Sequence, residues 1–208
     1  MQHPAATVWD RIEEARSRHD VLEHPFYQRW SAGELTAEEL ADYSGQYRHA
    51  VAAIATLSEQ IAADLPDHPE LDGHAAEERQ HIDLWDGFAA AVGGDSGAGA
   101  NAETADCVEV WTERDGALAA LARLYAIESG QPEISKTKLE GLAEHYGVTD
   151  APGTRYFTVH RGRDVEHAAE GRELLEELIC SAEDEDAVVA AADRAFAANW
   201  RLLDGVSA

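Results

Sequence analysis

Two segments of this chain repeat one spacing of metal-binding residue types: a histidine, an acidic residue four positions later, and a second histidine three positions further on. They are His74, Glu78 and His81 in one segment, and His160, Asp164 and His167 in the other. On an α-helix such positions fall within about 60° of one another and form a narrow polar stripe along one face. Two facing helices of this kind can enclose a pair of metal ions inside a bundle. The spacing therefore favours a metal-dependent enzyme.

Each triplet also has a simpler interpretation, because a histidine and an acidic residue four positions apart can pair on a helix surface. Apolar residues next to both triplets, such as Ile82 and Trp85 or Tyr156 and Phe157, favour a buried site instead. Imidazole and carboxylate ligands suit iron, manganese or zinc, whereas the absence of cysteine from the stripes argues against a structural zinc site. The triplets alone leave the identity of the metal open.

A bundle site needs a further carboxylate from a third helix, and Glu128 is the candidate. It follows the apolar stretch LARLYAI, where a buried glutamate is costly unless a positive charge receives it. The alternative is an exposed glutamate at a helix end, just before Gly130. The chain has only two lysines, Lys136 and Lys138, and Lys138 could fold back over the site. Four tyrosines are the aromatic residues expected to line the same cavity, although a single tyrosine of this kind is more often a core residue: Tyr27, Tyr47, Tyr125 and Tyr156.

The chain is 208 residues long and strongly acidic, with 41 aspartate and glutamate residues against 16 lysines and arginines, and a net charge of −25. Such a chain repels phosphate backbones and anionic lipids, so nucleic acid and membrane surfaces are not expected as partners. The acidic residues are spread along the whole chain, which argues against a disordered acidic tail. A carboxylate-rich surface with little lysine suggests a halophilic protein.

The two cysteines, Cys107 and Cys180, are too few and too isolated for a disulfide framework or a zinc knuckle. The N-terminal residues lack a basic segment followed by an apolar one, and no apolar run is long enough to span a bilayer. We therefore expect a cytoplasmic protein. The length suits a single domain, residues 1–208.

Helical periodicity dominates the sequence, and no segment is convincing as a β-strand. Thr36 and Glu39 form a capping box, which opens a long helix that Pro66 ends. A helix break is expected at Gln131 and Pro132, and the glycine-rich segment 93–102 is expected to be a flexible connection. The pattern predicts an all-α bundle of about seven helices, with helical segments at residues 7–19, 26–30, 36–65, 70–92, 105–130, 134–145, 154–180 and 184–203.

Four segments carry a resemblance to a known family: HPFYQRWSAGELTAEELADYSGQY, HIDLWDGFAAAVG, YAIESGQPEISKTKLEGLAEHYG and YFTVHRGRDVEHA. The most specific parts are the pattern Glu-Ser-x-x-Pro-x-Ile-x3-Lys, from Glu128, and the pattern His-x3-Asp-x2-His, from His160. They resemble the haem-oxygenase-like dimetal oxidases, and within these the group of the chlamydial protein associating with death domains (CADD) and its bacterial and archaeal relatives. The resemblance implies a seven-helix haem-oxygenase-like bundle that binds two metal ions, Fe/Fe or Fe/Mn, rather than haem, and that uses O2 as co-substrate.

Carried over by position, the family's metal ligands fall on His81, Glu128, His160, Asp164 and His167. The family's sixth ligand is a glutamate whose spacing lands on His74 in this chain. A loss of two residues would put the role on Glu77 or Glu78 instead. We choose Glu78, because it shares the stripe with His81 in the Glu-x-x-His arrangement that di-iron bundles use. His74 is kept as a substitute ligand or a neighbour of the ligands.

The same group is associated with an unusual synthesis of p-aminobenzoate, the folate precursor, in which the enzyme's own tyrosine supplies the ring and a lysine supplies the amino nitrogen. By position the tyrosine corresponds to Tyr27 and the lysine to Lys138, whereas Lys136 is a bystander. Tyr156 keeps an aromatic position that the family places beside the metals. The tyrosine before the family's glutamate is Ile127 here, so a radical relay through that position must differ. The resemblance thus implies catalytic roles for Tyr27, Lys138 and Tyr156.

The main alternative is a dimetal oxidase of the same fold that acts on an external fatty acid or amino acid, turns over repeatedly and tolerates the loss of Tyr27. The TenA thiamin-degrading enzymes use a catalytic cysteine and an aspartate, and this chain has neither at the expected position. Its two cysteines lie elsewhere in the sequence, and Gln46 and Tyr47 stand where the aspartate is expected. PqqC-type enzymes need no metal and would not need six ligand residues. A protein that only binds death domains is disfavoured by the acidic surface. Besides O2, the expected partners are a small-molecule substrate or reductant and a second copy in a homodimer, and no organic cofactor site is assigned.

Overall fold

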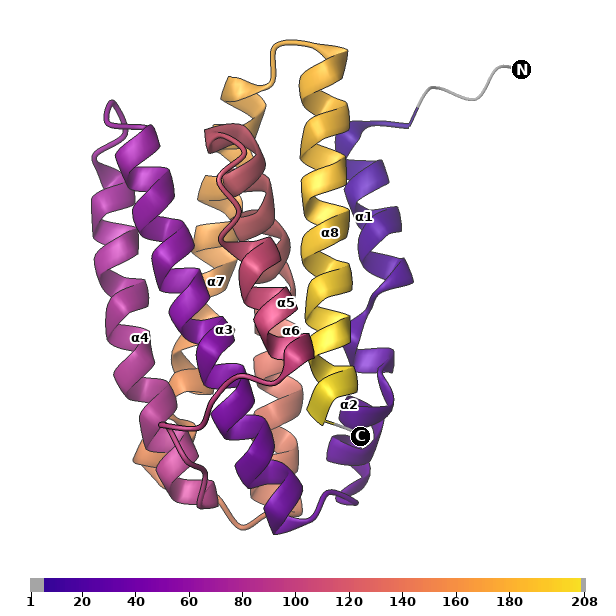
Figure 1. Ribbon diagram of the computed structural model, residues 1–208, viewed down its shortest axis with the longest axis vertical. Helices are drawn as coiled ribbons and strands as arrows, with labels where there is room; N and C mark the ends of the chain where they lie inside the picture. The colour runs from indigo at the N-terminus through magenta and orange to yellow at the C-terminus, as the bar shows by residue number, and fades with distance from the viewer. Residues whose placement is uncertain (1–5, 207–208) are drawn as a thin grey trace.

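The computed structural model describes residues 6–206, which form a bundle of α-helices (Figure 1). This part of the chain has eight α-helices and no β-strand, so the predicted all-α class is confirmed. The elements are α1 (Val8–Arg18), the 3-10 helix η1 (Val21–Glu23), α2 (Pro25–Ala32), α3 (Ala37–Asp64), α4 (Glu70–Val92), α5 (Ala102–Trp111), α6 (Ala117–Glu144), α7 (Ala151–Leu178) and α8 (Ala182–Val206). None of the helices within residues 6–206 combines the length with the apolar composition that crossing a membrane requires.

The long helices end where the sequence supplies capping residues. The Thr36 hydroxyl accepts a hydrogen bond from the Glu39 amide, and the Glu39 carboxylate accepts one from the Thr36 amide, as the predicted capping box requires. Gly93 ends α4 with a φ of 77°, a left-handed conformation that residues with a Cβ atom disfavour. These ends define α3 and α4, and α4 carries the first triplet.

Two predicted helix boundaries were wrong. The predicted helix 105–130 is two helices, because α5 ends at Trp111 and α6 begins after Gly116, whose φ of 107° is incompatible with a helix. The predicted break at Pro132 is absent, and α6 runs through it. Proline has no amide proton for the carbonyl of Glu128, at a cost of about 3 kcal/mol, which the packing of α6 against α7 and α8 offsets.

The long helices α3, α4, α6 and α7 form the part of the bundle in which the two triplets meet. α3 lies beside α4, α4 lies beside α7, and α7 packs most extensively against α6 (Figure 1). α8 packs against α6, α5 and α1, and α5 also contacts α3. The two triplets are therefore carried by neighbouring helices, with α6 close to the second of them.

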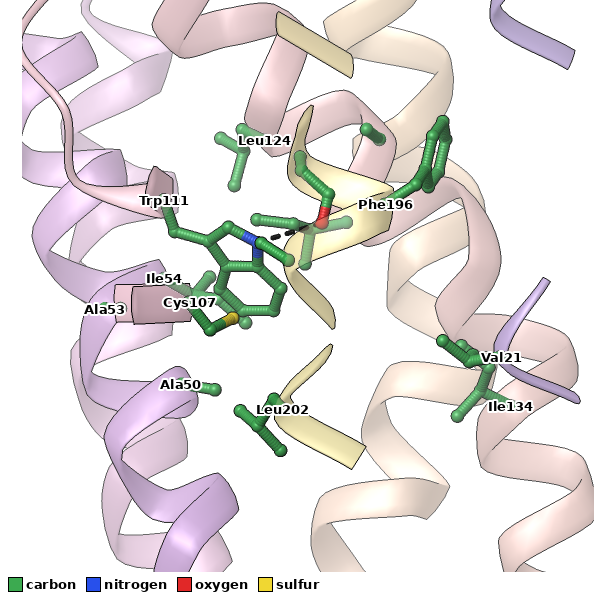
Figure 2. Close-up of a cluster of buried hydrophobic side chains, with 14 of the residues drawn as sticks. Val21, Ala50, Ala53, Ile54, Cys107, Trp111, Leu124, Ile134, Phe196 and Leu202 are labelled. Carbon is green, nitrogen blue, oxygen red and sulfur yellow. Dashed lines mark hydrogen bonds between the residues drawn. The ribbon is translucent and has the colours of Figure 1, made fainter. Parts of the chain in front are cut away.

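An apolar core formed by α3, α5, α6 and α8 holds this arrangement together (Figure 2). Trp111 is fully buried there, and its indole N–H donates to the Ala195 carbonyl at 3.2 Å. Cys107 is a free, fully buried cysteine beside it, and burial raises the pKa of its thiol, so it acts as an apolar side chain. Burying one large apolar side chain stabilises the fold by about 1.5–3 kcal/mol.

Candidate metal centre

Three helices converge on one buried cluster of histidine and acidic side chains. The first triplet lies along α4, the second along α7, and Glu128 joins them from α6. Each of the six predicted ligands is at most 5% exposed: Glu78, His81, Glu128, His160, Asp164 and His167. The side chain of His74 is part of the cluster too and is 12% exposed. Burying so many ionisable groups together is unfavourable unless they share a compensating partner.

The cluster divides into two groups that share Glu78. Ligand atoms lie within 4.8 Å of one another in each group, which are His74, Glu78, Glu128 and His167 in one and Glu78, His81 and His160 in the other. The Glu78 Oε1 atom lies 3.1 Å from His81 Nδ1 and 3.8 Å from His74 Nε2. A carboxylate that belongs to both groups has the position of a bridge between two metal ions.

Several ligand atoms in the cluster are buried without a hydrogen-bond partner, namely His74 Nε2, His81 Nδ1, Glu128 Oε1, His160 Nε2, His167 Nδ1 and both carboxylate oxygens of Asp164. The closest pair, His74 Nε2 and Glu128 Oε1, is 2.8 Å apart in a geometry unsuited to a hydrogen bond. A buried polar atom left unsatisfied costs about 1–3 kcal/mol. Divalent cations would satisfy these atoms together, so the donor set fits a centre of two metal ions.

Contacts on the outer side of the histidine rings fix how the rings are turned. His160 Nδ1 bonds to the Tyr156 carbonyl at 2.8 Å, which leaves Nε2 for the cluster. His167 Nε2 lies 3.3 Å from the Glu77 carboxylate, which Arg163 in turn binds at 2.9 Å. Outer partners of this kind orient metal-binding histidines and raise their basicity. Glu77, one of the two glutamates considered for the sixth ligand, thus supports His167 from outside the cluster.

Burial sets the protonation of the cluster when no cation compensates it. It raises the pKa of Asp164 to about 10 and lowers the pKa of both His160 and His167 to about 4. Burial also acts to raise the pKa of Glu78, but the nearby imidazole of His81 and the other histidines outweigh it, so the net shift of this pKa is downward. At neutral pH, Asp164 is therefore protonated and both imidazoles are neutral, and a bound cation would displace the proton.

Lys138 lies in a cage of aromatic rings on the inner side of α6. It is 1% exposed, and its Nζ atom is 4.7–5.4 Å from the centroids of five rings, those of Tyr27, Tyr43, Tyr47, Trp85 and Phe157. The amine donates a hydrogen bond to the Tyr43 hydroxyl at 2.5 Å. Burial lowers the pKa of Lys138 well below its ordinary value, and no carboxylate among the described residues pairs with it. Lys136, the other lysine, is exposed.

Aromatic rings connect the metal cluster with the cage. The Tyr156 ring stacks on the His160 ring with centroids 3.9 Å apart, and it meets the Trp85 ring edge-on at 4.8 Å. Trp85 in turn lies 5.9 Å from Tyr43. Tyr27 packs against the neighbouring rings of α2 and faces Lys138. Tyr156 is thus next to the candidate ligands, and Tyr27 is next to the lysine.

The structure separates the four tyrosines that the sequence singles out. Tyr27 and Tyr47 belong to the cage and Tyr156 lies beside it, whereas Tyr125 is half-buried and lines pockets on the outer side of the cluster. Sequence reasoning missed Tyr43, the hydrogen-bond partner of Lys138. Tyr43 precedes Tyr47 by one helical turn and so shares its face of α3, a signal that the sequence does contain.

Comparison with known proteins places these features in context. Residues 69–200 match the family described as iron-containing redox enzymes. The chain is 32% identical over 214 residues to the 4-aminobenzoate synthase of Nitrosomonas europaea, with 92% of this chain and 87% of the relative covered. It is 33% identical over 210 residues to the 4-aminobenzoate synthase of Chlamydia muridarum, with 94% and 88% covered.

Solved structures share the fold at low sequence identity. A TenA homologue from Pseudomonas syringae superposes with a TM-score of 0.83 at 17% identity, over 96% of this chain and 91% of that one. A CADD-like protein of unknown function from Nostoc punctiforme superposes with a TM-score of 0.69, also at 17% identity, over 96% and 95%. A domain from Shewanella denitrificans described as having a haem-oxygenase-like fold gives 0.79 at 21% identity, over 98% and 93%.

Proposed function

The chain belongs to the family of iron-containing redox enzymes, and on this premise we propose that it is an oxygen-dependent dimetal oxidase that forms 4-aminobenzoate. Tyr27 supplies the aromatic ring, and Lys138 supplies the amino nitrogen. The observation that carries the proposal is a buried lysine of lowered pKa in an aromatic cage, close to a buried cluster of histidines and carboxylates. Similarity over nearly the whole chain to proteins named 4-aminobenzoate synthase supports the product.

The proposed ligands of the metal centre are Glu78, His81, Glu128, His160, Asp164 and His167, with His74 as a seventh candidate. Two bound iron ions, or one iron and one manganese ion, would supply the electrons that reduce O2. Glu78 holds the two groups together, because its carboxylate belongs to both. Tyr156 and Glu77 keep the imidazoles of His160 and His167 turned toward the cluster.

Lys138 acts as a nitrogen nucleophile, which requires a neutral amine. Burial favours that neutral form at physiological pH. The Tyr43 hydroxyl accepts a hydrogen bond from Nζ and so holds the amine against the rings of the cage. Burial also raises the pKa of Tyr27 well above its ordinary value, so its phenol keeps the proton until the ring is oxidised. The closed cage excludes water, which would otherwise compete with the amine.

The proposed product fixes which bonds have to change. In 4-aminobenzoate the amino and carboxyl groups are para to each other, as are the hydroxyl group and Cβ of a tyrosine. The Lys138 nitrogen therefore replaces the phenolic oxygen of Tyr27, which leaves as water, and the bond between this nitrogen and Cε breaks. Cβ of Tyr27 becomes the carboxyl carbon and its bond to Cα breaks, an oxidation for which O2 is the oxidant and the source of oxygen. These changes consume the chain's own side chains, so each chain forms at most one product molecule.

The test is to load the anaerobic protein with Fe(II) and Mn(II), admit O2, and measure 4-aminobenzoate together with the masses of the peptides that contain Tyr27 and Lys138. We expect no more than one product per chain and a loss of mass at both residues. Tyr27→Phe and Lys138→Met should abolish the product without changing the metal content. Tyr125→Phe is the control, because it removes a tyrosine hydroxyl that lies outside the cage and should retain product. Undiminished product from Tyr27→Phe would refute the role of Tyr27.

A dimetal oxidase that acts on an external fatty acid or amino acid remains the second candidate, favoured by a pocket of about 250 Å³ that reaches the cluster from outside. The same experiment separates the two functions. An external substrate would be consumed over many turnovers, and both peptides would keep their masses.

A further inference from the structure

A pocket of about 250 Å³ opens between α4, α6 and α7 and reaches the metal cluster. Its inner end is formed by His74, Glu128 and His167, which are three of the four residues in one group of candidate ligands. The outer part of the pocket, farther from the cluster, is lined by one histidine and four exposed glutamates: His68, Glu70, Glu170, Glu173 and Glu177. No lysine or arginine lines the pocket. Cation-binding side chains therefore extend from the surface to the cluster.

Three of these glutamates, those of α7, have no structural partner. The side chains of Glu170, Glu173 and Glu177 make no ion pair and no hydrogen bond within residues 6–206, whereas the side chain of their neighbour Glu176 binds Arg172 at 3.1 Å. Their spacing of three and four residues places them on one face of the helix, where like charges repel by about 0.2–0.5 kcal/mol per pair. The fold thus carries a local charge repulsion that no contact within the described residues relieves.

The inner end of the pocket independently indicates a cation. Glu128 and His167 are 4% and 2% exposed and line the pocket, and each has a buried atom without a hydrogen-bond partner, Oε1 and Nδ1 respectively. A neutral apolar molecule would leave these atoms unsatisfied, and an anion would be repelled by the four outer glutamates on its way in. A divalent cation suits both the carboxylates of the outer part and the mixed ligands of the inner part.

We propose that this pocket is the path by which divalent metal ions reach the centre, and that Glu170, Glu173 and Glu177 capture the ions at its mouth. The proposal rests on the proposed metal centre, but it concerns how fast the ions arrive rather than which residues finally hold them. A concave surface lined by charges of one sign concentrates counter-ions and raises association rates about 10–1000-fold. Exposed carboxylates hold an ion only weakly, so they release it to the buried ligands.

Stopped-flow mixing of the metal-free chain with Co(II), followed by the visible absorption of the bound ion, measures uptake without any need for activity. The triple variant Glu170→Gln, Glu173→Gln and Glu177→Gln should take up Co(II) about fivefold more slowly at low ionic strength. It should reach the same final number of ions per chain, because the buried ligands are unchanged. The difference should shrink as salt is added, since salt screens exposed charges.

A matched control removes the same charge elsewhere. Glu38, Glu109 and Glu140 are exposed, have no ion pair within the described residues, and lie outside the pocket. Their replacement by glutamine should slow Co(II) uptake by less than about twofold, as expected of a change in overall charge alone. Equal slowing in the two triple variants would overturn the proposal, and so would an unchanged rate in the pocket variant.

Gly171 offers a second variant that leaves the charge unchanged. It lines the pocket, and a Cβ atom added there meets only the Tyr125 side chain, at 4.0 Å, so Gly171→Leu should fold and narrow the opening. Slower Co(II) uptake by this variant supports the path, and an unchanged rate refutes it. If the native chain takes up no Co(II), the proposed metal centre itself is refuted. If the native chain takes up Co(II), but at a rate that no pocket variant changes, only the proposed path is refuted.

Discussion

Replacing Lys138 by methionine should stabilise the protein at mildly alkaline pH, and the gain should shrink as the pH rises. The amine is 1% exposed, is surrounded by aromatic rings, and is hydrogen-bonded to the Tyr43 phenol. Burial lowers the pKa of Lys138 well below its ordinary value, so the folded chain holds a neutral amine where the unfolded chain holds a charged one. At any pH between the pKa of this amine in the folded chain and its higher pKa in the unfolded chain, folding requires the release of one proton.

The size of the expected stabilisation follows from the free energy of releasing that proton. A lysine in an unfolded chain has a pKa of about 10.4, and releasing its proton costs about 1.4 kcal/mol for each pH unit below that value. At about pH 8.4 the penalty is therefore about 2.7 kcal/mol for a lysine that is neutral when folded. Methionine removes the penalty and loses one hydrogen bond worth about 1 kcal/mol. The net gain expected at this pH is about 1.7 kcal/mol.

The sign of the pH dependence is fixed, because the folded chain binds one proton fewer than the unfolded chain. The stability of the native sequence therefore rises with pH, and the advantage of Lys138→Met falls by about 1.4 kcal/mol per pH unit. Urea unfolding of both metal-free proteins at several pH values measures this slope. Lys136→Met, at the exposed lysine, is the control and should show no such slope. A pH-independent difference for Lys138→Met would refute a neutral amine, as would a net loss of stability at mildly alkaline pH.

Three further measurements address other parts of the structure. Mn(II) at a hundred times its dissociation constant should add about 2.7 kcal/mol to the free energy of unfolding in anaerobic urea titrations, an effect that Asp164→Asn should largely remove. Pro132→Ala should stabilise the chain by about 2 kcal/mol in the same assay, because it supplies the missing amide opposite the Glu128 carbonyl. The Arg29 guanidinium and the Thr36 amide lower the pKa of Glu39 to about 2. Glu39→Gln should therefore cost about 1 kcal/mol above pH 4.5, and the loss should disappear as the pH falls toward 2.

The positions of the candidate ligands could be predicted from the sequence, because residues three or four positions apart lie on the same face of an α-helix. His160, Asp164 and His167 lie along α7 and are all buried, and on α4 Glu78 and His81 are buried while the His74 side chain is 12% exposed. The capping box at Thr36 is equally local, since it depends on residues three positions apart. Features of this kind need no knowledge of the rest of the chain.

Other features depend on contacts between distant residues. Glu77 and Glu78 are adjacent in the sequence, yet Glu77 is bound by Arg163, 86 residues away, while Glu78 lies inside the cluster. Pro132 has the local signature of a helix break, and only the packing of α6 between its neighbours explains why the helix continues. The partner of Lys138 was missed for the same reason, because α3 and α6 come together only in the folded bundle.

The amine and the candidate metal centre occupy different parts of the bundle, so in the proposed reaction an electron that leaves Tyr27 has to cross the aromatic rings between them. Trp85 and Phe157 both contact Tyr156 and Lys138, and the indole is the more easily oxidised of the two rings. Trp85 lies 4.8 Å from Tyr156, and Lys138 Nζ is 5.4 Å from its centroid. Trp85→Phe keeps an aromatic ring but removes the easily oxidised indole, and we expect 4-aminobenzoate to form about tenfold more slowly, a barrier increase of about 1.4 kcal/mol.

Trp111→Phe is the control for Trp85→Phe, because both indoles are fully buried and both donate to a backbone carbonyl, at 3.2 Å for Trp111 and 2.7 Å for Trp85. The two variants therefore lose similar packing and one hydrogen bond each, but only one of them interrupts the rings beside the lysine. Metal content and the free energy of unfolding, measured for both, separate loss of structure from loss of reaction. Equal slowing of product formation in both variants would mean that the Trp85 ring supports the cage without carrying electrons.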